Sequence, residues 1–207
     1  MKYDIIKPLH KNGDWCDVSK YRPVSLLTSF SKISETLMQR RILKHLTKCN
    51  ILNTEQYGFR LGFRTDNATY KLTTEILNAM NNKLLVAGIF CDLEKAFDCV
   101  NHDILLSKLK FYGISDKDLR LCHSYLDKRY CRKAIYNNSE KSNKVSNWAK
   151  VRHEVPQGSV LGPLIFLLYM NDLPKIINKT PALIIFSDDT SILFAHSNPT
   201  DFNETFT

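Results

Sequence analysis

Two short apolar runs that each end in aspartate constrain this chain more than any other feature. Residues 84–92 (LLVAGIFCD) are rich in strand formers and end in Asp92. Residues 182–186 (ALIIF) are followed directly by Ser187, Asp188 and Asp189. Buried strands seldom end in unpaired acids, because a desolvated charge needs a partner. One such acid would indicate only the end of a strand, whereas both together predict two buried strands that carry carboxylates to one site.

The chemistry of three carboxylates narrows the function of that site. Mg²⁺ prefers oxygen ligands and usually takes one or two carboxylates together with phosphate oxygens. Two such ions, roughly 4 Å apart, can stabilise the attacking and leaving oxygens of a phosphoryl transfer. Asp92 and Asp188 can hold these ions if their strands lie side by side, and a tight turn after residue 186 would bring Asp189 back toward them. Residues 190–195 are the predicted partner strand of that hairpin.

A Gln-Gly loop lies between the two acidic strands in sequence. Residues 156–162 (PQGSVLG) are predicted to form a loop, and residues 164–170 a buried helix that ends before Pro174. Glycine at position 158 allows another backbone to approach closely.

Composition sets broad limits. The 207 residues suffice for one large or two small domains, and 43% hydrophobic with 24% charged residues is ordinary for a protein with a core. Lys and Arg outnumber Asp and Glu by 29 to 21, and the resulting charge of +8 suits a polyanionic partner such as nucleic acid. Six cysteines without a C-x-x-C pair favour reduced thiols over a disulfide framework or a zinc site. With no membrane-length apolar run and no signal peptide, we expect an intracellular protein without a membrane partner, nuclear or cytoplasmic.

The remaining segments are predicted to form a continuous α/β mixture. Residues 1–23 are expected to be irregular or extended because prolines and a glycine interrupt them. Asn101 and Ser115 are the expected N-caps of two helices, the first ending before Gly113 and the second near Arg129. The other predicted elements are helices at 24–47 and 67–81, strands at 130–136 and near 148–155, a turn at 137–139 and a frayed tail. Along 24–47 the predicted buried stripe is Leu26, Phe30, Ile33, Leu37, Ile42 and Leu46.

Five strings, in one order, resemble the reverse transcriptase domain of non-LTR (LINE-like) retrotransposons. They are KYRPVSLLTSFSKISETL at 20–37, EQYGFR at 55–60, FCDLEKAFDCVNHDILLSKL at 90–109, VPQGSVLGPLIFLLYMNDLP at 155–174 and FSDDTSIL at 186–193. The resemblance implies an α+β fold with the fingers and part of the palm of a right-hand polymerase, in which helices back an antiparallel palm sheet. It also implies a division into 1–83 (N-terminal fingers), 84–101 (palm strand with the first acid), 102–153 (helices and hairpin) and 154–207 (palm with Gln-Gly loop and Asp-Asp hairpin).

The resemblance further implies an RNA-directed DNA polymerase that transfers nucleotides to a primer 3′-hydroxyl with two Mg²⁺ ions, for which Mn²⁺ can substitute. Its partners would be an RNA template, a DNA primer and a dNTP. The matching catalytic and metal-binding residues are Asp92, Asp188 and Asp189. Nucleotide contacts would come from Phe97, Gln157, Gly158 and Arg60, and a template contact from Arg22.

Simpler roles stay open for several of these residues. Phe97 alone would more often be a core residue, and Arg22 and Arg60 can be surface charges. The acidic box contains Phe186 and Ser187 where the family has Tyr and Ala. Glu154 stands where a glycine usually precedes Val-Pro-Gln-Gly, and it would be strained if that position needs a positive φ.

The ends of the chain suggest a piece of a larger polypeptide. Eighteen residues follow Asp189 and 19 precede Lys20, whereas the family carries a thumb after this region and an endonuclease before it. We therefore expect a truncated domain whose missing thumb and endonuclease belong to the same polypeptide. Two alternatives remain: a catalytically inactive nucleic-acid-binding remnant, and an unselected product that does not fold stably.

Overall fold

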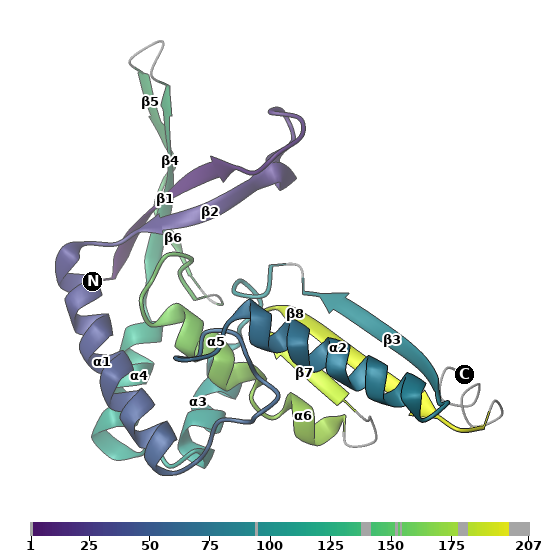
Figure 1. Cartoon of the computed structure of the whole chain (residues 1–207). Coiled ribbons are helices and arrows are strands. Elements are labelled where there is room, and N and C mark those ends of the chain that lie inside the picture. The colour runs from purple at the N-terminus through teal and green to yellow at the C-terminus, as the bar shows by residue number, and fades with distance from the viewer. Residues whose placement is uncertain are drawn as a thin grey trace. The chain divides into compact units, whose positions relative to one another are not determined.

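The computed structural model of the chain describes residues 2–93, 95–137, 142–151, 153, 155–177 and 182–198. The chain divides into two compact units, each built from two separate stretches of sequence. The first unit contains Met1–Asn50 and Phe97–Phe166, and the second contains Ile51–Ala96 and Leu167–Thr207. Figure 1 labels the elements of both.

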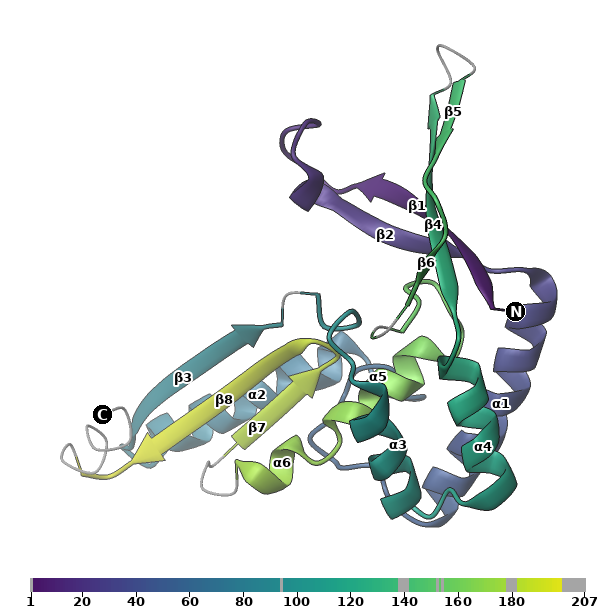
Figure 2. The same cartoon turned by 180° about the vertical axis from the view of Figure 1, so that it is seen from behind.

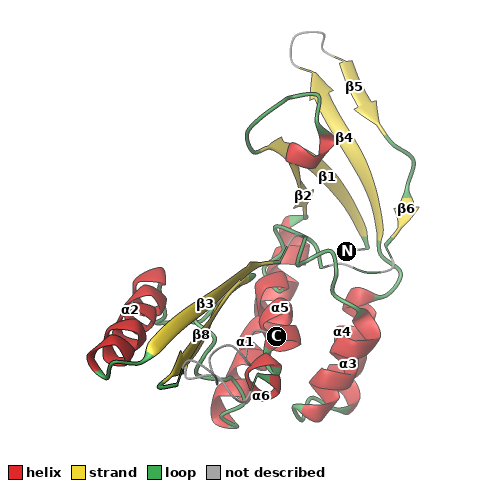
Figure 3. Cartoon of the chain, turned by 90° about the vertical axis from the view of Figure 1, so that its right-hand side faces the viewer, coloured by secondary structure: helices red, strands yellow, loops and turns green. Residues whose placement is uncertain are grey.

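A five-stranded sheet forms one part of the first unit (Figure 3). Its strands are β1 (Tyr3–His10), β2 (Tyr21–Leu26, after the 3-10 turn η1 at Val18–Lys20), β4 (Tyr130–Asn137), β5 (Ser142–Val145) and β6 (Ala149–Lys150). The order is β2-β1-β4-β5, and β6 also pairs with β4. β1 is antiparallel to β2 and parallel to β4.

Of the two expectations for 1–23, irregular or extended, the extended one is right where β1 and the start of β2 lie. The prolines that suggested irregularity are accommodated by the register. Pro8 is the Cα partner of Pro23, and the pairing of β1 with β4 stops at Ile6, before Pro8. Since proline lacks a backbone N–H, it is tolerated where no second strand needs that donor.

Helix α1 (Ser29–Lys48) confirms the predicted helix but starts later, because β2 continues to Leu26. Its N-cap is Thr28, whose hydroxyl oxygen accepts from the backbone N–H of Ser31 at 3.3 Å. The predicted stripe is right for Ile42 and Leu46, which are buried. It is wrong for its first four members, since Leu26, Phe30, Ile33 and Leu37 are 49%, 80%, 59% and 56% exposed. The buried residues of α1 are Ser31, Glu35, Met38, Ile42 and Leu46. The buried face therefore includes an acid, which an apolar search passes over.

Helices α3 (His102–Phe111) and α4 (Asp116–Leu126) pack against each other in the first unit (Figure 2). Asn101 caps α3 as predicted: its side-chain oxygen accepts from the N–H groups of Asp103 and Ile104 at 2.9 and 3.2 Å. Ser115 stands at the N-cap of α4 but makes no side-chain capping bond, and α4 ends at Leu126 rather than near Arg129.

Of the return strand predicted near 148–155, only the two residues of β6 are present, and they pair with β4. The longer antiparallel partner of β4 is β5, which comes earlier in the sequence than predicted. Most of the predicted turn at 137–139 and of the tail lies outside the described residues.

A three-stranded antiparallel sheet, ordered β3-β8-β7, forms the centre of the second unit. Its strands are β3 (Leu85–Asp92), β7 (Ala182–Phe186) and β8 (Asp189–His196). Helix α2 (Thr65–Asn81) covers one face of this sheet, as Figures 1 and 2 both show. The buried cluster between them consists of Ala68, Ala182, Ile184 and Leu193, with Tyr57, Leu72, Ile76 and Phe186 packed against it. Helix α5 (Gly162–Met170) runs from the first unit into the second, and α6 (Leu173–Ile176) follows.

The two acidic strands differ in burial. β7 is buried through Ile185, as predicted. The expectation that 84–92 is a buried strand is right about the strand and wrong about burial, since Phe90 is 65% and Leu85 42% exposed. The buried cluster under α2 contains residues of β7 and β8 (Ala182, Ile184 and Leu193), which accounts for the burial of β7.

Two absences apply to the described part of the chain. None of its helices is long and apolar enough to cross a membrane. All six cysteines are free thiols.

Candidate active site

The turn between β7 and β8 carries two of the three aspartates. Phe186 pairs with Asp189 as the last step of the β7–β8 ladder, so Ser187 and Asp188 form the turn itself. Ser187 has a φ of +61°, a left-handed conformation that is uncommon for a residue with a Cβ atom. Asp188 is half-buried and Asp189 is exposed.

The third aspartate lies directly beside this turn. Asp92 is the Cα partner of Asp189 at the end of the β3–β8 ladder. Directly opposite residues of an antiparallel pair place their side chains on the same face of the sheet, with Cβ atoms about 5 Å apart. The backbone N–H of Leu93 also donates to the carbonyl of Asp188 at 3.4 Å. The prediction that the two apolar runs lie side by side is wrong: β3 and β7 belong to one sheet, but β8 lies between them and pairs with both. Asp189, the first residue of β8, is therefore opposite Asp92 in place of Asp188.

The electrostatics of the turn reflect this crowding of negative charge. Partial burial, followed by the charges of Asp188 and Asp92, raises the pKa of Asp189 above its ordinary value. A cation would relieve the same repulsion. Among the described residues, however, no group of three or more His, Cys, Asp or Glu side chains converges closely enough to hold a metal ion. The oxygen atoms and negative charge of the three carboxylates thus suit a hard cation. In this structure, however, the three side chains do not converge on one metal position.

Residues 55–58 support the turn from the other edge of the sheet. The N–H of Tyr57 donates to the carbonyl of Ile185 at 2.7 Å, and the N–H of Ile185 donates to the carbonyl of Glu55 at 2.8 Å. Gln56 is 1% exposed, and its Oε1 accepts from the N–H of Gly58 at 2.9 Å. These residues extend β7 by a short parallel bridge.

Gly58 packs directly on the acidic turn. A Cβ atom at this position would lie 2.1 Å from the backbone nitrogen of Ser187 and 2.8 Å from its Cα. Sequence reasoning assigned no site role to Gly58 or Gln56. The sequence signal that includes both is EQYGFR at 55–60, one of the five strings quoted above.

Arg60, the predicted nucleotide contact in this unit, interacts with its own loop. Its Nη1 donates to the carbonyls of Asn53 and Gln56 at 2.6 and 3.1 Å, and its guanidinium lies 4.4 Å from the centre of the Phe63 ring. Burial lowers the pKa of Arg60 below its ordinary value, against the opposing influence of Tyr57 and Glu55. The structure therefore gives Arg60 a structural role in the 53–63 loop, and its nucleotide contact stays a prediction.

The first unit brings the Gln-Gly loop beside Phe97. The N–H of Val155 donates to the carbonyl of Phe97 at 3.0 Å, and Nε2 of Gln157 lies 3.5 Å from Oδ1 of Asp98. The half-buried Phe97 ring stacks on Phe166 with 5.0 Å between ring centres. Phe97 thus has a packing partner, consistent with the core role left open above, and is partly accessible.

Strand β2 also contacts this loop. The N–H of Ser25 donates to the carbonyl of Gln157 at 2.8 Å. Gly158 has a φ of +99°, and a Cβ atom there would lie 3.1 Å from the carbonyl oxygen of Ser25. Both constraints require glycine, as the close-approach argument predicted. Arg22 is exposed on the same strand, opposite Leu9.

Glu154 lies outside the described residues, so its expected strain stays a prediction.

Comparison with known proteins agrees with this architecture. Residues 9–205 match the family model described as reverse transcriptase (RNA-dependent DNA polymerase). The chain is 36% identical over 207 residues to the probable RNA-directed DNA polymerase from transposon BS of Drosophila melanogaster, covering 94% of this chain and 21% of that protein. It is 34% identical to the RNA-directed DNA polymerase from mobile element jockey of the same species, covering 89% of this chain and 20% of that protein. The chain thus spans about a fifth of the length of these relatives.

Solved structures show the same fold at low sequence identity. Apo telomerase from Candida tropicalis truncated from its C-terminal domain superposes with a TM-score of 0.63 at 17% identity, covering 99% of this chain and 45% of that one. Telomerase from the same species in complex with a fragment of telomeric RNA superposes with a TM-score of 0.65 at 16% identity, covering 99% of this chain and 37% of that one.

Proposed function

Because the chain belongs to the reverse transcriptase (RNA-dependent DNA polymerase) family, we propose that it supplies the acidic site of an RNA-directed DNA polymerase of the non-LTR retrotransposon type. The observation that carries the proposal is the pairing of Asp92 with Asp189 beside the Ser187–Asp188 turn. The division into 1–83 (N-terminal fingers), 84–101 (palm strand with the first acid), 102–153 (helices and hairpin that complete fingers and palm) and 154–207 (palm) stays a prediction.

Asp92, Asp188 and Asp189 are the residues that would hold two Mg²⁺ ions, with Mn²⁺ as a substitute. Such ions would stabilise negative charge on the attacking and leaving oxygens of nucleotidyl transfer. The chain itself positions these carboxylates. The ladder between β3 and β8 keeps Asp92 opposite Asp189, and Gly58 packs against the backbone of the turn at Ser187.

The proposed substrates are a dNTP, a DNA primer and an RNA template. Phe97, Gln157 and Gly158 are proposed to contact the nucleotide, since they adjoin one another in the first unit and Phe97 is partly accessible. A flat ring can exclude a 2′-hydroxyl by contact alone. Arg22 is an exposed cation on β2 suited to a template phosphate. The relatives' names mention RNA-directed DNA polymerases, and one telomerase structure contains RNA, which favours nucleic acid as the partner.

Manganese binding tests the acidic site without requiring catalysis. In a ¹H–¹⁵N spectrum, Mn²⁺ should selectively broaden the amides near Asp92, Asp188 and Asp189, and Asp188→Asn should weaken this effect about tenfold or more. Asp103→Asn is the matched control, because Asp103 is an exposed acid in the first turn of α3. Equal broadening in both variants would refute the metal site. In a longer protein that contains this chain, Asp188→Asn should abolish Mg²⁺-dependent primer extension.

A nucleic-acid-binding role without catalysis is the second candidate. It is favoured by the net charge of +8 and by the finding that, in the described part of the chain, the three carboxylates do not converge around one point. Binding to an RNA–DNA hybrid that weakens steeply with salt, combined with no Mn²⁺ site and no extension in the longer protein, would select this alternative.

A further inference from the structure

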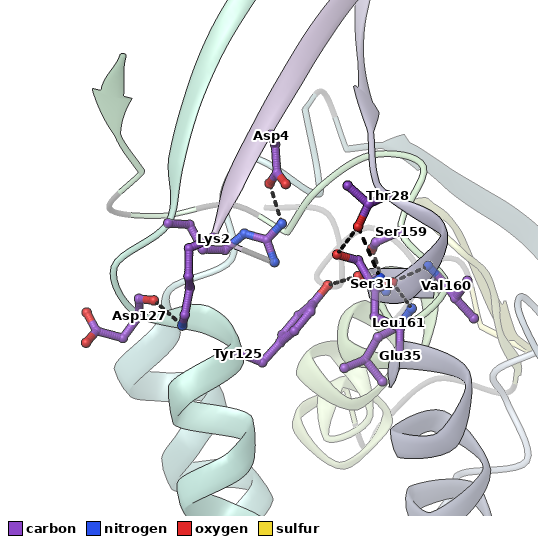
Figure 4. Close-up of polar contacts among 12 residues, drawn as sticks. Lys2, Asp4, Thr28, Ser31, Glu35, Tyr125, Asp127, Ser159, Val160 and Leu161 are labelled. Atoms are coloured by element: carbon purple, nitrogen blue, oxygen red, sulfur yellow. Dashed lines mark hydrogen bonds and ion pairs between the residues drawn. The ribbon is translucent and has the colours of Figure 1, made fainter. Parts of the chain in front are cut away.

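A chain of buried polar side chains crosses the first unit from β1 to the Gln-Gly loop (Figure 4). It begins with Asp4 on β1, which forms an ion pair with Arg129. The Arg129 guanidinium lies 5.0 Å from the centre of the Tyr125 ring, and the Tyr125 hydroxyl donates to Glu35 of α1 at 3.2 Å. Asp4, Arg129 and Glu35 are 3%, 1% and 1% exposed. None of these contacts belongs to the acidic site described above.

The last contacts of this series are hydrogen bonds between Glu35 and the backbone of the Gln-Gly loop. Its Oε2 accepts from the N–H groups of Val160 and Leu161 at 2.7 and 3.3 Å, while Oε1 takes the Tyr125 hydroxyl. These two N–H groups stand just before α5, which begins at Gly162. Because the first N–H groups at a helix start have no partner within the helix, a carboxylate there satisfies donors that would otherwise be buried without one.

A buried position on α1 is unfavourable for a glutamate unless hydrogen bonds to the loop compensate the burial of its charge. Burying a carboxylate is unfavourable until its partners compensate the charge, and apolar side chains of similar volume are often at least as stable in such a position. The neighbouring turns of the buried face carry Met38 and Ile42, so an aliphatic side chain would fit the pattern of α1. An aliphatic side chain would, however, leave the N–H groups of Val160 and Leu161 without this acceptor.

We propose that Glu35 is a positioning residue that holds the Gln157–Gly158 loop in place between α1 and β2. This inference rests on the proposed function, in which that loop contacts the nucleotide. Ser25 holds the loop at Gln157, and Glu35 holds it at Val160 and Leu161, three and four residues later. Gln39, one turn along α1, adds a bond from its Nε2 to the carbonyl of Val160 at 3.2 Å. The loop is therefore held at both ends by elements distant in sequence.

Two variants of Glu35 separate positioning from general stability. Glu35→Gln keeps an oxygen for the two N–H groups but loses the charge, which weakens the hydrogen bonds by about tenfold in equilibrium terms. Glu35→Leu removes the acceptor altogether. Leu37→Ala is the matched control, since Leu37 lies on α1 two residues after Glu35 and is 56% exposed. Amide hydrogen exchange measures how well the loop amides are protected. The dNTP KM and kcat of a longer protein that contains this chain measure the effect on nucleotide use.

The expected order of exchange at Val160 and Leu161 is wild type, then Glu35→Gln about tenfold faster, then Glu35→Leu faster again, with Leu105 and Leu109 of α3 unchanged. The dNTP KM should rise in the same order, with kcat affected less, and Leu37→Ala should stay within about twofold of wild type in both readouts. Unchanged exchange in Glu35→Gln, or an equal increase across the first unit, would overturn the positioning role. If the wild-type protein never extends a primer, the proposed function fails, and the exchange measurement still decides whether Glu35 holds the loop.

Discussion

Replacing Gly58 by alanine tests whether the 55–58 segment supports the acidic turn. The added methyl group would lie 2.1 Å from the backbone nitrogen of Ser187, 2.8 Å from its Cα and 3.0 Å from the carbonyl carbon of Phe186. All three atoms are backbone, so no side chain can rotate away. Either the 55–58 segment or the turn that carries Asp188 must move by roughly 1 Å to restore ordinary contact.

The size of the effect follows from two opposing contributions. Overpacking a rigid contact costs about 1–3 kcal/mol, whereas Gly→Ala stabilises by about 0.4–1 kcal/mol through the unfolded chain. We therefore expect Gly58→Ala to lower the free energy of unfolding by about 1–2 kcal/mol. A displacement of roughly 1 Å at a reacting group can reduce a rate by about 100-fold. Mn²⁺ binding and any primer extension should therefore be lost even where the variant stays folded.

Urea unfolding and ¹H–¹⁵N spectra of the variant measure both effects. Gly62→Ala is the control, because Gly62 has a φ of +84° and nothing within 4 Å of a Cβ atom. It should show backbone strain of about 1 kcal/mol but leave the amide shifts of Ser187, Asp188 and Asp189 unchanged. The reasoning is refuted if Gly58→Ala has wild-type stability and unshifted amides at those three residues.

Three further predictions concern the first unit. Arg129→Met should lower the free energy of unfolding in urea by about 3–5 kcal/mol because it leaves Asp4 charged and buried, and a loss below about 1 kcal/mol would contradict a buried pair. Asn101→Ala should cost about 1 kcal/mol and Ser115→Ala less than about 0.5 kcal/mol in the same assay, since only Asn101 makes capping bonds; equal losses would refute this difference. Burial, then Asp118, raises the pKa of Cys122 from 9.0 to about 11, so native Cys122 should resist alkylation at pH 9 while Cys16 reacts, as read by mass spectrometry. Because only the unfolded chain loses this proton between those values, stability should fall as pH rises from about 9 to about 11, and Cys122→Ala should reduce that fall.

Local signals predicted the elements that depend on local interactions. The Asn101 cap, the α2 helix and the two acidic strands follow from residue preferences within a few positions, and each is present. Burial was less predictable, since it depends on neighbours far along the chain. Phe90 is exposed on β3, whereas residues of β7 and β8 form the buried cluster under α2. Leu37 is exposed because Glu35 and Met38 lie on the buried face of α1.

The sequence by itself determined where the carboxylates stand along the chain, that they adjoin the ends of strands, and that Gly158 allows a close backbone approach. It also determined the family, since the matching strings occur in one order over nearly the whole chain. Only the tertiary structure decided that Asp189 is opposite Asp92, that Gly58 packs on Ser187 and that Glu35 binds the loop. These three facts depend on strand register and on contacts between residues more than 90 positions apart, for which no local preference carries information.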